Sequence, residues 1–137
     1  TFGYVNGALE LAEQLERGEA PRPSNIHVAA GTMGTVAGIA IGLAWAGLDI
    51  PIVATRITVK LLTNERALAA LVRATLARLR AAGATDLPDA DAAVRLVELR
   101  HDQIGGGYGQ PAEAGAAATE RFAAAGLRLD VGVVCHP

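Results

Sequence analysis

Cysteine and aromatic residues are scarce in this sequence, and neither sign of charge dominates. Its one cysteine, Cys135, excludes a disulfide framework and a CxxC metal site. Aromatic residues make up 4% of the chain, so a core would have to be aliphatic and rich in alanine. With 12 basic and 14 acidic residues the net charge is −2, which excludes a nucleic-acid binder that relies on clustered positive charge.

Apolar residues are abundant instead. They make up 51% of the 137 residues, while charged residues make up 19%, which excludes disorder and predicts a packed core. This length suits one domain, so we expect a single α/β domain over residues 1–137. The sequence begins at Thr1 and shows no charged-then-apolar leader, so we expect a reducing, cytoplasmic setting.

The stretch from Val28 to Leu48 carries no charged residue, and its length would allow a membrane span. Five glycines interrupt it, and no aromatic belt or basic flank follows it. We therefore predict a buried strand, turn and helix here rather than a span.

Strand-like and helix-like segments alternate along the chain. This alternation predicts an α/β fold of three layers, a mainly parallel sheet of three or four strands with flanking helices. The expected helices cover residues 3–17, 36–46, 112–125 and a segment capped by Thr63 or Asn64 that runs to about Ala82, with Gly83 as its C-cap. The expected strands cover residues 26–30, 52–59, 94–99 and 127–134, with a connector over 88–93.

The segment Gly31-Thr32-Met33-Gly34-Thr35 is the most informative one for function. It lies between an expected strand and an expected helix, where ligands bind in α/β sheets. Glycines allow a tight turn, a helix start offers free N–H groups to an anion, and the threonines add hydroxyl donors. The pattern is neither GxGxxG nor a Walker loop. These residues alone fit a phosphate site and a plain glycine turn equally.

Other candidates are weaker when taken alone. Tyr108 stands in the glycine-rich stretch 105–111 and could contact a ligand or transfer a proton, although a surface turn is the simpler interpretation. The histidines have no metal-ligand spacing. Lys60 is the only lysine, and its place at the end of an expected strand favours an exposed side chain over a covalent role.

Taken together, several segments resemble the C-terminal half of a pyridoxal-phosphate enzyme family. The family is that of 1-aminocyclopropane-1-carboxylate deaminase and D-cysteine desulfhydrase, with the tryptophan-synthase-β-like fold called fold type II. The resemblance rests on the order and spacing of four segments, from residue 3 to about residue 130: GYVNGALELAEQ, NIHVAAGTMGTVAGIAIGL, GYGQPAEAG and GLRLD.

The resemblance implies roles for particular residues. The loop 31–35 would wrap the phosphate of pyridoxal 5′-phosphate, with Thr32 and Thr35 as hydroxyl donors, and Tyr108 would face the substrate side of the cofactor. The family chemistry would release ammonia and a 2-oxo acid from a small amino acid. The resemblance also places the Schiff-base lysine in an N-terminal half that this sequence does not contain. Valines, about Val133 and Val134, stand where the family has a polar contact to the pyridine nitrogen.

Three functions therefore remain open at this stage. The first is a part of a pyridoxal-phosphate deaminase or desulfhydrase that supplies the phosphate cradle and is inactive alone. The second is a non-catalytic α/β module that binds a phosphorylated ligand or a partner. The third, another Rossmann-like nucleotide binder, lacks the dinucleotide fingerprint. An apolar helix taken from a larger protein would leave surface exposed, so we expect a homo-oligomer or a chain carrying the missing half as partner.

Overall fold

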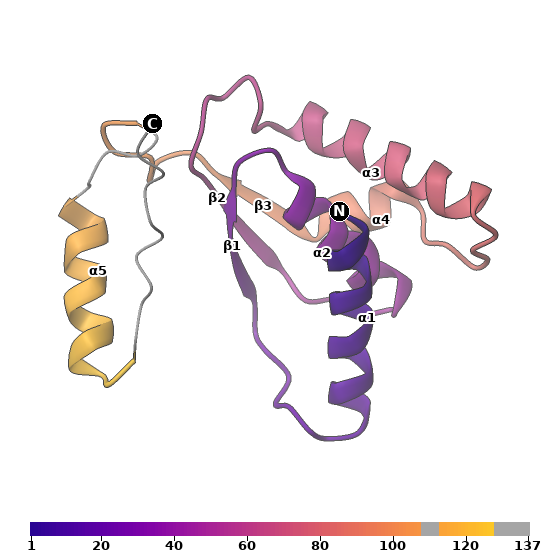
Figure 1. The fold of residues 1–137 in the computed structure, drawn as a ribbon, viewed down its shortest axis with the longest axis horizontal. Coiled ribbons are helices and arrows are strands. Elements are labelled where there is room, and N and C mark those ends of the chain that lie inside the picture. The colour runs from indigo at the N-terminus through magenta and orange to yellow at the C-terminus, as the bar shows by residue number, and fades with distance from the viewer. Residues whose placement is uncertain (108–112, 128–137) are drawn as a thin grey trace. The chain divides into compact units, whose positions relative to one another are not determined.

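The computed structural model describes residues 1–107 and 113–127. They fall into two compact units, Thr1–Gln103 and a second that begins at Ile104 (Figure 1). The first unit contains α1 (Phe2–Glu16), β1 (Ile26–Ala30), α2 (Gly34–Trp45), β2 (Ile52–Arg56), α3 (Glu65–Ala81), α4 (Ala90–Arg95) and β3 (Val97–Arg100). The described part of the second contains α5 (Glu113–Ala124). The expectation of one domain over residues 1–137 stays a prediction.

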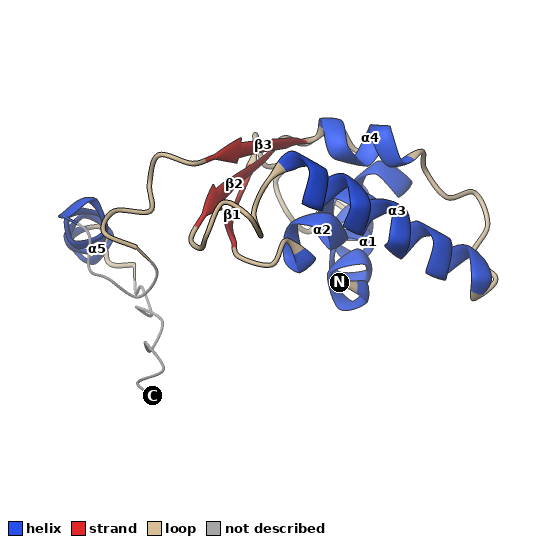
Figure 2. Ribbon diagram, turned by 90° about the horizontal axis from the view of Figure 1, so that it is seen from above, coloured by secondary structure: helices blue, strands red, loops and turns tan. Residues whose placement is uncertain are grey.

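The three strands form one parallel sheet in the order β1-β2-β3, and their arrows point toward the same end in Figure 2. Ile26 pairs with Ile52, which pairs in turn with Val97. One face of the sheet joins the core through Ile26, Val28, Ala30, Ile52, Ala54, Val97 and Leu99. On the other face His27, Ala29, Glu98 and Arg100 are exposed. The α/β fold class predicted from the sequence, a parallel sheet with flanking helices, is confirmed.

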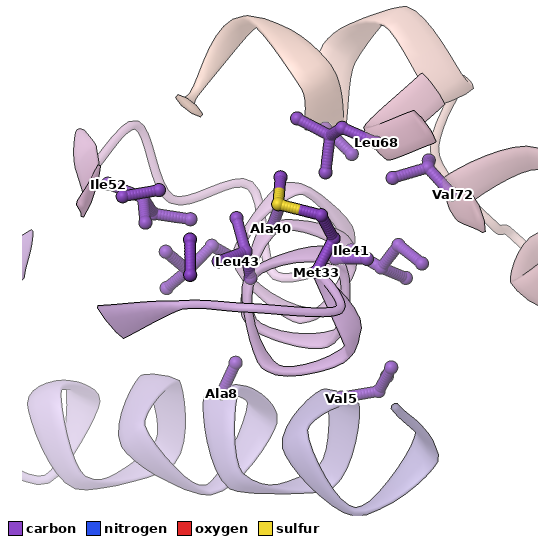
Figure 3. Packing of buried hydrophobic residues seen from close by; sticks show 14 of the residues in the cluster. Val5, Ala8, Met33, Ala40, Ile41, Leu43, Ile52, Leu68 and Val72 are labelled. Carbon is purple, nitrogen blue, oxygen red and sulfur yellow. The ribbon is translucent and has the colours of Figure 1, made fainter. Parts of the chain in front are cut away.

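Helix α2 is the centre of the core. It is apolar all round, and seven of its twelve residues are buried, as the sequence predicted. In Figure 3, Val5 and Ala8 of α1 lie on one side of α2, and Leu68 and Val72 of α3 lie on another. None of the buried residues in the described part of the chain is aromatic, which agrees with the low aromatic content.

Helices α1 and α2 approach closely at two glycines. A Cβ atom added to Gly42 would lie 2.6 Å from both the Ala8 Cβ atom and the Val5 carbonyl oxygen. One added to Gly38 would meet the Thr1 carbonyl oxygen and lie 2.7 Å from the Tyr4 Cβ atom. The two helices therefore approach closely at these glycines, where no side chain stands between them.

Helix α3 shows why its bounds could be read from the sequence. The Asn64 side chain accepts a hydrogen bond of 2.9 Å from the Ala67 N–H group, which makes Asn64 the N-cap. At the other end Ala82 is the C-cap, and Gly83 follows it with a φ of +93°. The arginines of α3 are exposed, and Leu68, Val72, Thr75 and Leu76 are buried.

Two strands differ from their predicted bounds. The strand predicted over 52–59 ends at Arg56, because β1 ends at Ala30, the register partner of Arg56. The strand predicted over 94–99 is β3 at Val97–Arg100, because residues 94 and 95 finish α4. Residues 90–93 of the connector predicted over 88–93 therefore form the first four residues of α4.

Helix α5 agrees with the helix predicted over 112–125, and Gly126 follows it with a φ of +73°. The strand predicted over 127–134 lies outside the described residues except for Leu127, which is not in a strand. Within the described ranges, the helices are too short or too polar to cross a bilayer.

Candidate functional site

The loop 31–35 joins the carboxyl end of β1 to the start of α2. Its five residues lie together as predicted, and they differ in exposure. Thr32 is exposed, Thr35 is half-buried, and the Met33 side chain is 2% exposed and belongs to the core. The methionine therefore anchors the loop while a threonine hydroxyl stays accessible.

Backbone conformation turns the loop sharply into α2. Met33 is the N-cap and adopts a left-handed conformation with a φ of +66°, which residues other than glycine rarely adopt. The hydrogen bond from the Ala37 N–H group to the Met33 carbonyl oxygen, 2.9 Å, is the first along the helix. The N–H groups of residues 34–36 thus have no partner within the helix, and among the described residues no side chain caps them.

These donors suit an anion. The start of a helix carries partial positive charge, and the first turn of α2 holds no acidic residue. The two glycines of the loop are not crowded: a Cβ atom added to Gly34 would be in ordinary contact with its nearest neighbour, the Thr1 Oγ1 atom, at 3.4 Å. A Cβ added to Gly31 would have only the Ile57 Cγ1 atom at 4.0 Å. The loop thus offers N–H groups and hydroxyls with no carboxylate among them, a donor set that fits a phosphate group.

A second loop, residues 57–64, follows β2 and lies against the first. The Ile57 N–H group donates a hydrogen bond of 3.0 Å to the Ala30 carbonyl oxygen. The Thr63 hydroxyl donates one of 2.6 Å to the Gly31 carbonyl oxygen. Thr63 is completely buried, and sequence reasoning considered it only as a possible helix cap. Ile57 is therefore bonded to the last residue of β1, and Gly31 is bonded to Thr63 of the second loop.

Arg56 and His101 form a polar cluster at the same end of the sheet, and no sequence motif predicted it. The Arg56 Nε group donates to the His101 Nδ1 atom at 3.1 Å, and its Nη2 group donates to the His101 carbonyl oxygen at 3.1 Å. Its Nη1 group donates to the Thr58 carbonyl oxygen at 2.6 Å. Glu65, at the start of α3, places its Oε1 atom 3.8 Å from the His101 Nε2 atom. Arg56 thus fastens the end of β2 to the residue that follows β3.

The described part of the structure places no other predicted site residue at the loop 31–35. Tyr108 lies outside the described residues, as do Val133 and Val134. Lys60 is exposed on the loop 57–64, as its sequence position predicted. The roles assigned to the loop 31–35 and to Tyr108 stay predictions.

The sequence of this chain is similar to that of known enzymes. No protein-family model matches the chain. D-cysteine desulfhydrases from Salmonella paratyphi B, Salmonella newport and Salmonella heidelberg are each 31% identical to it over 130 residues. The alignment covers 94% of this chain but 36% of each relative, so the chain spans little more than a third of the length of the curated relatives it matches. The chain is therefore similar over nearly its whole length to part of the D-cysteine desulfhydrases, which confirms the resemblance predicted from its motifs.

Proposed function

We propose that this chain is the cofactor-phosphate cradle of a pyridoxal-phosphate-dependent desulfhydrase or deaminase. The observation that carries the proposal is the loop 31–35, which places N–H and hydroxyl donors without a carboxylate at the carboxyl end of a parallel strand. The likeness to D-cysteine desulfhydrases supports it. The substrate would be a small amino acid, and the products would be ammonia and a 2-oxo acid.

The chain's own residues would hold the phosphate rather than perform the reaction. The N–H groups of residues 34–36 and the hydroxyls of Thr32 and Thr35 would donate hydrogen bonds to the phosphate oxygens. Met33, packed in the core, would keep the loop in shape. Pyridoxal phosphate, when bound, supplies the electron sink for the reaction. Tyr108 would lie on the substrate side.

The test is binding of pyridoxal 5′-phosphate and of inorganic phosphate by the purified chain and by Gly34→Asp. An aspartate at this position repels phosphate, yet an acidic residue at a helix start does not weaken the helix, so the fold should survive. We expect affinity to fall at least about tenfold, as for the loss of one charge-assisted hydrogen bond. Gly7→Asp is the matched control, because Gly7 is exposed on α1 with nothing within 4 Å of an added Cβ.

Each outcome of this test is decisive. Equal affinity in Gly34→Asp and the unsubstituted chain would contradict the assignment of the loop. Failure of the unsubstituted chain to bind either compound would contradict the proposal itself. We also expect no turnover of D-cysteine by the chain alone. Turnover of D-cysteine by the purified chain would overturn that expectation. A borohydride-reducible cofactor adduct on Lys60, located by peptide mass spectrometry, would count against a non-catalytic module.

We further propose that apolar side chains beside the cradle are covered by more polypeptide. In the loop 57–64, Val59 is 59% exposed, Leu61 84% and Leu62 49%. Exposed apolar groups that lie together mark contact surfaces. The purified chain should therefore self-associate in sedimentation velocity, and Leu61→Asp should reduce the association. A monomer that binds no hydrophobic dye would contradict this.

A further inference from the structure

Thr63 is a buried polar residue that the proposed function leaves without a role. It is 0% exposed, while its neighbours Leu61 and Leu62 are exposed, so the chain turns inward at this residue. Its hydroxyl donates at 2.6 Å to the Gly31 carbonyl oxygen and lies 3.4 Å from the Ala30 carbonyl oxygen. A single side chain thus reaches the last residue of β1 and the first residue of the proposed cradle.

The position of Thr63 is itself fixed by its neighbour. The Asn64 side chain accepts from the Ala67 N–H group and donates to the Lys60 and Leu61 carbonyl oxygens at 3.0 and 2.9 Å. The segment before α3 is therefore closed by side-chain hydrogen bonds on both sides of residue 63. Thr63 is therefore held by the start of α3, and its hydroxyl points to the loop that precedes α2.

The consequence for the cradle follows from the peptide bond. In a planar trans peptide the carbonyl and the N–H group point in opposite directions. Because Thr63 holds the Gly31 carbonyl oxygen toward the interior, the Thr32 N–H group points away from Thr63. It precedes Met33, and N–H groups around a left-handed residue form a concave site for anions.

We infer that Thr63 is a positioning residue for phosphate binding: its hydroxyl sets the orientation of the Gly31–Thr32 peptide and so aims the Thr32 N–H group at the anion. This inference rests on the proposed function. It adds a residue that lies 32 positions after Gly31 and contacts no phosphate itself.

The experiment compares Thr63→Val with Thr63→Ser and with Thr75→Val. Valine keeps the shape of threonine and removes the hydroxyl, whereas serine keeps the hydroxyl. Thr75 is the matched control because it is the other buried polar residue among those described, and it lies within α3. Folding of each variant is checked by circular dichroism before titration.

Two readouts are taken on each variant. The first is the 15N chemical shift of the Thr32 amide in the free chain, which reports the hydrogen bond to the carbonyl of the same peptide. The second is the Kd for inorganic phosphate. We expect the shift to move in Thr63→Val alone and the Kd to rise about tenfold in Thr63→Val alone, as for one lost hydrogen bond. Serine should restore both.

The two proposals fail in different ways. If the unsubstituted chain binds phosphate and Thr63→Val binds it equally well, the positioning role is overturned and the proposed function stands. If the unsubstituted chain does not bind phosphate, the proposed function is overturned, and the role of Thr63 in binding goes with it. Should Thr63→Val not fold, the exchange of the Thr63 hydroxyl proton in the unsubstituted chain decides the positioning role instead. Fast exchange with water would overturn the inference, and a protected proton would support it.

Discussion

Replacement of Gly42 by alanine tests the packing of α1 on α2 most directly. The new Cβ atom would lie 2.6 Å from the Ala8 Cβ atom and from the Val5 carbonyl oxygen. Non-bonded carbons rest at about 3.5–4.0 Å, so the helices must separate by about 1 Å. One of the atoms in the way belongs to the backbone and cannot rotate aside. Overpacking of this kind costs about 1–3 kcal/mol, and alanine returns about 1 kcal/mol of helix propensity. We expect a net loss of up to about 2 kcal/mol.

The matched control is Gly7→Ala, the same change on the exposed side of α1. An added Cβ there has nothing within 4 Å, so only the helix propensity remains. We expect this variant to be more stable by about 0.5–1 kcal/mol.

The assay is urea unfolding followed by far-ultraviolet circular dichroism. With a slope of about 2 kcal/mol per molar urea, the midpoint of Gly42→Ala should fall by up to about 1 M, and that of Gly7→Ala should rise. A Gly42→Ala midpoint that rises as much as that of Gly7→Ala would refute the close packing of the two helices.

The remaining predictions concern a cap, the core and an exposed ion pair. Asn64→Ala removes the N-cap of α3 and should cost about 1 kcal/mol in urea unfolding; an unchanged midpoint would contradict the cap. Leu68→Ala empties a core site that is 1% exposed and should cost about 2–5 kcal/mol. The same change at Leu61, 84% exposed, should stay within about 0.5 kcal/mol, and similar costs at both sites would count against the core assignment. Hydrogen bonds from Arg100 lower the pKa of Asp102 from 3.8 to about 2. Its stabilising effect should therefore be complete above about pH 4 and disappear as the pH falls through 2; carboxyl NMR should place the midpoint near 2, and Arg100→Gln should raise it.

The sequence predicted the bounds of those elements whose ends carry a proline, a glycine turn or a helix-capping residue. The strand Ile26–Ala30 has its predicted bounds, because prolines precede it and a glycine turn follows it. The start of α3 could be read from Thr63-Asn64, because only a few residue types cap helices.

The errors arose where a neighbouring segment decides the structure. Residues 57–59 are Ile, Thr and Val, which favour strands, yet β1 ends at Ala30 and offers no further partner. At the site, the five residues of the loop 31–35 could be picked out as one segment. The hydrogen bonds of Thr63 to Gly31 and of Arg56 to His101 join residues 32 and 45 positions apart, and no local pattern indicates such pairs.

The parallel order of the strands has a consequence for the kinetics of folding. Every strand pairing needs a crossover: Ile26 meets Ile52, 26 positions along the chain, and Ile52 meets Val97, 45 positions along. The longer closure costs only about 0.5 kcal/mol more, so both pairings are comparably slow relative to helix formation. The tether from Thr63 to Gly31 can close only after β1 and β2 have paired. During refolding, helix signals should therefore develop first, and the ability to bind an anion at the loop 31–35 should be acquired last.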